Sequence, residues 1–329
     1  MKLALPTLIF EFDTVHFDSF GVKCKYERRQ AHYFHEPLSD GVPLEMIEIP
    51  EGIVQIGSPN TEAGRSNDEK EPHSVALNSF FISKYPITQV QWRAIASLPK
   101  VKYPLHLKPS AFEGLNRPVE KISWIEASEF CARLSAITGR TYRLPTEIEW
   151  EYACRAGTST PFHFGETLTT DLANYCGEDH HKKNRRRQGI WYKGNYGNGP
   201  TGIARRETTE VGYFKVANTF GLYDLHGNVW EWCSHDCWKQ STNEEEQIQQ
   251  PLRGGSWKSS PSACRSASRL LLSPNCQEAF VGFRVVYSIE IGPSSFQEPS
   301  QNLRSQSILS NVQAGRDITI GNITQIFNK

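Results

Sequence analysis

The sequence predicts an α+β fold that is rich in loops and contains two main helices and short strands. Two segments begin with a capping box and continue with apolar residues at helical spacing. Short apolar runs bounded by Gly and Pro indicate strands. From residue 157 onward the chain is aromatic and rich in turn-forming residues, with almost no helical period. These patterns favour a domain in which loops outweigh regular elements.

The helices have clear start and stop signals. Ser123 is an N-cap with Glu126 three residues later, and Gly139 supplies a left-handed stop. The second helix begins at Thr146, where another capping box starts, and a shorter helix is expected to begin at Thr88. The buried face of the first helix is predicted to contain Ala127, Phe130, Leu134 and Ile137.

The chain divides into four segments. Residues 1–43 form a strand-rich N-terminal preface, and residues 44–287 form the main domain. Residues 288–310 are rich in Ser, Gln, Asn and Pro, which is typical of a linker. Residues 311–329 suggest two short strands around a Gly-Asn turn, which would need the edge of a sheet to join. We expect this tail either to dock on the sheet edge of a partner or to be disordered.

Charge and composition exclude several classes of function. The 329 residues have a formal net charge of +0, which argues against a general nucleic-acid binder. The N-terminus lacks the features of a signal peptide, and no apolar run approaches the length of a membrane span. We therefore expect a cytoplasmic protein with no membrane association. A basic insert at residues 180–187 is interpreted as a surface loop, with a phosphate- or acid-binding patch as the alternative.

The eight cysteines do not indicate a disulfide scaffold in a chain of this length. Cys131 and Cys154 fall within the helical patterns and are interpreted as buried thiols. Cys233 and Cys237 lack a second pair of ligands at zinc spacing, so no zinc site is predicted.

Seven motifs follow one another in a fixed order between residues 44 and 287. They are Gly57-Ser58-Pro59, Tyr85-Pro86-Ile87-Thr88, Arg117-Pro118-Val119 with Ser123-Trp124, Arg143-Leu144-Pro145-Thr146-Glu147, Gly227-Asn228-Val229-Trp230-Glu231-Trp232, Arg253-Gly254-Gly255-Ser256-Trp257 and Gly282-Phe283-Arg284-Val285. In this order, over about three quarters of the chain, they resemble the formylglycine-generating (sulfatase-modifying) enzyme family. The resemblance implies a variant of the C-type lectin fold, with two helices and short twisted sheets.

The turn after Asp224 offers oxygen ligands. Asp224 and Glu231 flank a Gly-Asn-Val turn, and two carboxylates together with backbone oxygens suit calcium rather than zinc. The resemblance implies a structural calcium ion held by these two side chains and by the carbonyls of Gly227 and Val229. It also implies a second calcium site that begins at Asn174. The alternative is that the two carboxylates cap backbone amides.

The catalytic cysteine pair of the family is incomplete. The resemblance implies an oxidase that converts a substrate cysteine to formylglycine with copper held by two cysteines after the Gly-Gly-Ser motif. The later cysteine matches Cys264, but the earlier position is Ser259. A serine hydroxyl is a poor ligand for copper(I), so the pair of thiolates cannot form there. We therefore expect no copper and no oxidase activity, with Cys264 as a vestige.

Between Trp257 and Phe280, positions that are polar in other family members hold varied residues. This resembles the variable proteins of diversity-generating retroelements, which share the fold and diversify a C-terminal patch by mutating template adenines. Randomised Asn codons can give Ser, Ala, Leu, Cys or Phe, but they cannot give Lys, Gln or Glu. The predicted ligand-binding residues are Trp257, Lys258, Ser259, Ser260, Ala263, Ser268, Leu270, Leu271, Leu272, Ser273, Gln277, Glu278 and Phe280.

We expect the diversified side chains to face solvent and to bind a protein or another macromolecule. For the three leucines, the alternative is a buried strand or helical turn. The leading hypothesis is a non-catalytic ligand-binding protein. The first alternative is an oxidase that acts on protein cysteine through Cys264 with an unusual partner. A third hypothesis is a regulatory adaptor that works through its preface and tail.

Overall fold

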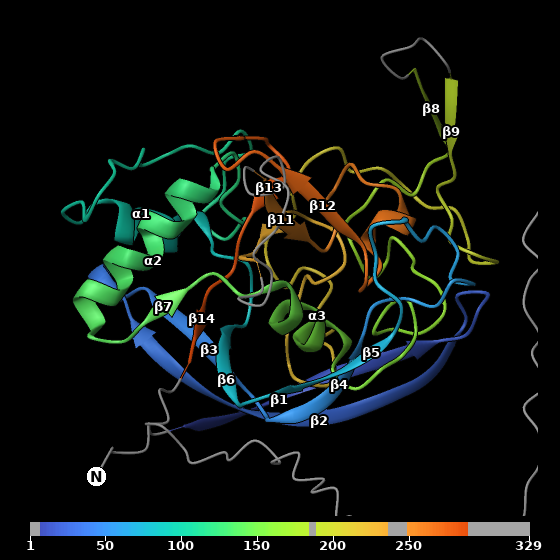
Figure 1. Cartoon of the computed structure of the whole chain (residues 1–329), viewed down its shortest axis with the longest axis horizontal. Helices are drawn as coiled ribbons and strands as arrows, with labels where there is room; N and C mark the ends of the chain where they lie inside the picture. Colours follow the sequence, from blue (N-terminus) through green and yellow to red (C-terminus); the bar gives the residue numbers. More distant parts are fainter. Residues whose placement is uncertain (1–6, 184–188, 236–248, 289–329) are drawn as a thin grey trace, which may run out of the picture. The chain divides into compact units, whose positions relative to one another are not determined.

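The computed structural model describes residues 7–183, 189–235 and 249–288. Helices and short strands alternate with long loops in this part of the chain, which confirms the predicted α+β, loop-rich fold (Figure 1). The predicted linker, apart from Ser288, and the predicted strand pair of the tail lie outside the described residues. No helix among the described residues is both long and apolar enough to span a lipid bilayer.

The predicted helix starts are confirmed. Helices α1 (Gln89–Ala96), α2 (Trp124–Thr138) and α3 (Glu147–Arg155) each begin with a complete capping box. Helix α2 ends at Gly139, whose φ of 68° lies in the left-handed region. The prediction of its buried face is wrong at one residue. Ile137 is 48% exposed, and Cys131 packs in the core instead.

The larger sheet joins elements from both ends of the described chain. Its six strands run in the order β1 (Leu8–Phe17), β2 (Lys23–Pro37), β3 (Pro43–Ile49), β6 (Phe80–Ser83), β14 (Val286–Tyr287) and β7 (Tyr142–Arg143). Figure 1 shows β1 and β2 as long, curved ribbons along one side of the domain. Because β2 pairs with β3, the N-terminal preface is continuous with the main domain, and no domain boundary falls at residue 43.

A second sheet carries the C-terminal motifs. Its four strands are β12 (Arg269–Leu272), β11 (Gln250–Arg253), β10 (Trp230–Trp232) and β13 (Val281–Gly282), in that order. Strands β10 and β13 are parallel, whereas the other pairs are antiparallel. Strand β12 is paired on one side only among the described strands, so it forms an edge of this sheet.

Two hairpins complete the strands. One consists of β4 (Gly52–Ile56) and β5 (His73–Leu77). The other consists of β8 (His180–Lys183) and β9 (Gly189–Tyr192), which flank the rest of the basic insert. The sequence predicted a surface loop there, so the paired strands are a correction to that prediction. Residues 184–188 of the insert lie outside the described residues.

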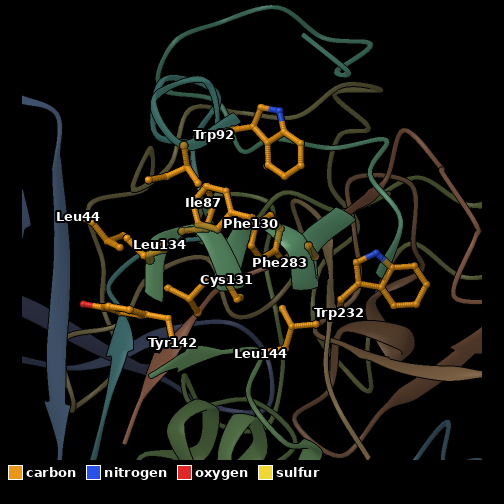
Figure 2. Packing of buried hydrophobic residues seen from close by; sticks show 14 of the residues in the cluster. Leu44, Ile87, Trp92, Phe130, Cys131, Leu134, Tyr142, Leu144, Trp232 and Phe283 are labelled. Atoms are coloured by element: carbon orange, nitrogen blue, oxygen red, sulfur yellow. The ribbon is translucent and has the colours of Figure 1, made fainter. Parts of the chain in front are cut away.

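Aromatic side chains from distant motifs meet in the main core, which Figure 2 shows. The rings of Trp92 and Phe130 stack with centroids 5.7 Å apart, and Phe283 meets Phe130 edge-on at 5.2 Å. All three side chains are fully buried. Such ring pairs add to the stabilisation that burial provides. The cluster joins α1 and α2 to the Gly282-Phe283-Arg284-Val285 motif.

Buried arginines organise the loops. Arg133 pairs with Glu129 on α2 and also donates to the carbonyls of Ala96, Leu98 and Tyr103. The Glu129 carboxylate accepts from three successive amides, those of Val101, Lys102 and Tyr103. The Arg133–Glu129 pair therefore supplies hydrogen-bond partners to the backbone of the loop after α1, which pairs with no described strand. Buried backbone N–H and C=O groups require such partners.

Candidate functional site

Gly255 and residues 264–269 form a rigid frame on either side of the loop predicted to bind ligand. Gly255 has a φ of 77°, and a Cβ atom there would lie 2.5 Å from the sulfur of Cys264. The buried Arg265 guanidinium then pairs with Glu62 at 2.5 Å and with Glu69 at 2.6 Å. Arg269 makes two hydrogen bonds to Glu147 at the start of α3. These contacts fix both ends of the loop that carries Lys258 to Ala263.

Most of the predicted ligand-binding residues reach the surface, but to different extents. The side chains of Lys258, Ser273, Gln277 and Glu278 are exposed. The half-buried members are Trp257, Ser259, Ser260, Ala263, Leu270, Leu271, Leu272 and Phe280. Ser268 is only 7% exposed, so its predicted place on the surface is wrong. It directly follows the buried run from Cys264 to Ala267, which places it within the frame.

We call the surface formed by residues 257–263 and 270–280 the C-terminal patch. Lys258 and Phe280 meet across it, with the lysine nitrogen 3.3 Å from the ring centroid. Trp257 donates through Nε1 to the carbonyl of Ala279 and meets Phe112 edge-on at 5.4 Å. Gln277 donates to Glu126 at the start of α2. The two halves of the patch are therefore in direct contact.

The three leucines of the patch form the edge strand β12. Leu270 and Leu272 pack against the main core, and Leu271 is not among the side chains that do so. This alternation follows from the two-residue period of a strand. The alternative of a buried strand is therefore correct in its secondary structure, while all three side chains keep partial exposure.

The position of the family cysteine pair is not suited to thiol chemistry. Cys264 is fully buried, and burial raises the pKa of its thiol. Its sulfur contacts the carbonyl of Ser260. The Ser259 hydroxyl accepts from the amide of Ser256 and lies 3.0 Å from the Ser256 hydroxyl. A reactive cysteine needs an accessible thiolate, and Cys264 offers neither property.

The predicted calcium ligands occupy a hydrogen-bonded network. The guanidinium of Arg284 donates to both oxygens of Glu231 at 2.6 and 2.8 Å, and Trp150 donates to the same carboxylate at 2.6 Å. Asp224 accepts from the amide of Gly212, and burial raises its pKa to about 6. Glu231 is thus already neutralised by a cation of the chain, and calcium would compete with Arg284 for it.

Asn174 lies against the same turn. Its carbonyl accepts from the amide of Asn228, and a Cβ atom on Gly227 would lie 2.3 Å from that carbonyl oxygen. The buried Oδ1 atom of Asn174 has no hydrogen-bond partner among the described residues. Carboxylate and amide oxygens such as those of Asp224 and Asn174 are of the kind that calcium takes, whereas the Glu231 carboxylate is already paired with Arg284. Among the described residues, no group of three or more His, Cys, Asp or Glu side chains is arranged to hold a metal ion.

A buried pair of histidines packs next to Cys264, and no sequence pattern predicted it. His163 and His226 stack with ring centroids 4.6 Å apart, and burial lowers the pKa of His226 to about 4. The neutral ring of His226 accepts from the amide of His163 and donates to the Cys264 carbonyl at 2.7 Å. Nothing in the local sequence signals this contact, because the three residues lie far apart in the chain.

Several known proteins are similar in sequence to this chain. The profile of the sulfatase-modifying factor enzyme 1-like domain matches residues 36–289. The chain is 29% identical to the chaperone protein LppX of Paenibacillus barcinonensis over 63% of its own length and 78% of that protein. It is 25% identical to the formylglycine-generating enzyme of Bos taurus over 74% of each. It is 28% identical to the serine/threonine-protein kinase pkn1 of Chlamydia pneumoniae, of which it spans only 39%.

Two solved structures show the same architecture. PvdO from Pseudomonas aeruginosa superposes with a TM-score of 0.59 at 26% identity, over 78% of this chain and 98% of that one. Treponema denticola variable protein 1 superposes with a TM-score of 0.58 at 23% identity, with the same coverage. The predicted C-type-lectin-like fold is confirmed by these findings.

Proposed function

Because the chain belongs to the family of the sulfatase-modifying factor enzyme 1-like domain, we propose that it uses this scaffold to present a ligand-binding patch without oxidase chemistry. The observation that carries the proposal is the state of Cys264, a fully buried thiol, together with Ser259 at the position where the resemblance implies a second cysteine. A rigid frame under a chemically varied surface is what a binding module requires. The ligand class is a protein or another macromolecule.

The alternative is an oxidase that acts on protein cysteine, and similarity to the formylglycine-generating enzyme of Bos taurus favours it. We expect the purified chain, supplied with copper(I) and oxygen, to bind less than about 0.1 equivalent of copper at Cys264. We also expect no conversion of a cysteine-containing peptide to its aldehyde, as judged by mass spectrometry. Cys264→Ser is the matched control. Stoichiometric copper and turnover that both disappear in this variant would establish the oxidase instead.

A patch built for binding should tolerate substitution. Alanine at Lys258, Gln277 or Glu278 is expected to change the free energy of unfolding by less than about 1 kcal/mol, because these side chains are exposed. Ser268→Glu is the contrasting control, since it would bury a charge and should cost more than about 2 kcal/mol. Urea denaturation measures both effects. Equal costs at the exposed and buried positions would contradict the division between patch and frame.

The binding function itself can be tested with a display library. Lys258, Ser260, Ser273, Gln277 and Glu278 would be randomised together and selected on a defined target such as lysozyme. We expect binders with dissociation constants in the micromolar range or below that keep the melting temperature of the parent. A library that is mostly unfolded, or one whose members bind no better than the parent, would count against the proposal.

Calcium at the Asp224 turn is also proposed, with Asp224 and the carbonyls of Gly227 and Val229 as donors and with Arg284 in place of calcium on Glu231, while Asn174 would begin a second site. Excess calcium added to chelator-treated protein is expected to raise the melting temperature by about 5 °C. Asp224→Asn should remove most of this rise, and magnesium should not replace calcium. Identical melting curves in calcium and in chelator would show that the Arg284 cation alone balances this network.

We also propose that the protein is located in the cytoplasm. The cysteines of the described residues are all free thiols, including the exposed Cys24. Free thiols persist in reducing compartments. Docking of the tail, residues 311–329, on a partner sheet edge is a further proposal, and removing residues 292–329 should abolish that binding while leaving the domain folded.

A further inference from the structure

A cleft lies beside α1, and no residue of the C-terminal patch lines it. It has a volume of about 320 Å³ and lies between α1 and the loop of residues 107–115. This volume falls at the lower end of the range for small-molecule sites, about 300–1,000 Å³. The residues of the cleft that carry the argument are Trp92, Arg93, Leu107, Lys108, Glu113 and Leu115.

The cleft contains positive charge that the chain does not neutralise. The Nε atom of Arg93 is buried and has no hydrogen-bond partner among the described residues. Neither Arg93 nor Lys108 forms an ion pair with a carboxylate in the described part of the chain, although Glu113 lines the same cleft. A buried donor without a partner carries a desolvation cost that a bound acceptor removes. The two cations and one carboxylate leave a single positive charge for a ligand to match.

The rest of the lining combines the polar side chains of Gln89 and Ser110 with a smaller apolar part, formed mainly by Trp92, Leu107 and Leu115. The indole nitrogen of Trp92 already donates to the carbonyl of His106 at 2.9 Å, so its ring presents no unmet polar group. Leu107 and Leu115 are about half exposed, at 47% and 54%. Exposed leucines in a concave site favour an apolar or aromatic ligand body. The lining therefore suits a molecule with an apolar body and one anionic group.

The outer wall of the cleft is held in place by two buried side chains. Gln89 donates to the carbonyl of Phe112 at 2.6 Å and accepts from the amide of Gly114 at 3.2 Å. The fully buried Glu120 accepts from the amide of Phe112 at 2.9 Å. The loop is therefore fixed before any ligand arrives, which lowers the entropic cost of binding.

We propose that this cleft binds a small monocarboxylate with an apolar body, with Arg93 as the main contact to the carboxylate and Lys108 as a second cation. Arginine suits this role because its guanidinium makes two parallel hydrogen bonds to a carboxylate. Glu113 discriminates against ligands with two negative charges. The site is separate from the C-terminal patch.

Phenylacetate is the probe, and its neutral amide, phenylacetamide, is the matched ligand control. Saturation-transfer NMR and calorimetry on the full chain should show that phenylacetate binds at least tenfold more tightly than the amide. Arg93→Gln should weaken phenylacetate binding at least tenfold, Arg93→Lys should restore part of it, and Glu113→Gln should tighten it a few-fold. Arg206→Gln, on the surface, is the control and should leave the affinity unchanged.

Circular dichroism and the melting temperature establish that each variant is folded before its affinity is compared. Lys258→Ala should not alter phenylacetate binding, because Lys258 belongs to the patch. Equal binding of phenylacetate and phenylacetamide would overturn the proposal, as would a folded Arg93→Gln variant with parental affinity. Absence of measurable phenylacetate binding at millimolar concentration would overturn it as well.

Discussion

Replacing Arg284 by Met is expected to lower the free energy of unfolding by about 3–5 kcal/mol. Arg284 is fully buried and holds both oxygens of Glu231, and it also donates to the carbonyls of Ser83 and Tyr223. Removing the guanidinium leaves a buried carboxylate that, among the described residues, keeps Trp150 alone as a side-chain hydrogen-bond donor, and two carbonyls lose the donor that Arg284 supplied. The loss is large because desolvated charges without a partner are costly.

A double variant separates loss of the ion pair from loss of packing. Arg284→Met combined with Glu231→Gln removes both charges and should recover part of the lost stability in urea denaturation. Arg28→Gln is the control, because its pairs with Glu11 and Asp13 lie on the surface, where solvent screens them, and should contribute far less to stability. If Arg284→Met costs no more than Arg28→Gln, the buried network does not hold the second sheet to the rest of the domain.

Replacing Glu120 by Gln is expected to stabilise the protein at pH 8 by up to about 3 kcal/mol. Burial raises the pKa of Glu120 from 4.5 to about 7, and its Oε2 atom has no hydrogen-bond partner among the described residues. The folded state therefore binds this proton more tightly than the unfolded state does. The resulting stability is present in full below pH 4.5 and is lost as the pH rises to about 7, at 1.36 kcal/mol per pH unit.

The measurement is the free energy of unfolding of both proteins between pH 4.5 and pH 8. Glu120→Gln keeps an acceptor for the Phe112 amide, so the two proteins should be similar at pH 4.5 and should diverge as the pH rises. Glu51→Gln, at an exposed position, is the matched control for the substitution itself. A constant difference between Glu120→Gln and the parent across this range would mean that Glu120 is not protonated preferentially in the folded state.

Local sequence signals predicted the helices well. Ser123, Thr146 and Thr88 each have their partner three residues later, so the caps depend on contacts that the sequence displays directly. Helical spacing placed Ile137 on the same face as the buried Phe130 and Leu134, but its side chain is half exposed. Spacing alone cannot show where the neighbouring elements end.

Long-range pairing was beyond the sequence. The parallel pairing of β10 with β13 and the antiparallel pairing of β2 with β3 depend on partners that no spacing rule identifies. The same holds for the buried arginines, because no sequence pattern shows that Glu62, Glu69 or Glu231 lies beside them. In the patch, Lys258, Gln277 and Glu278 were placed correctly because charged and amide side chains seldom lie buried.

Neither the side chain of Arg93 on α1, unpaired among the described residues, nor the buried carboxyl of Glu120 was suspected from the sequence. Neither sits in a recognisable motif, and each gains its properties from burial. Burial of a single polar group depends on the surrounding loops, which have no period to reveal them.

The ion pairs of Arg133, Arg265 and Arg284 lie out of reach of solvent counterions. Dissolved salt weakens attraction between exposed charges but has little effect on desolvated ones. The framework of this domain should therefore hold equally well in dilute buffer and in brine. Substitutions that reverse the charge of residues on the outer face should then leave the buried ion pairs intact.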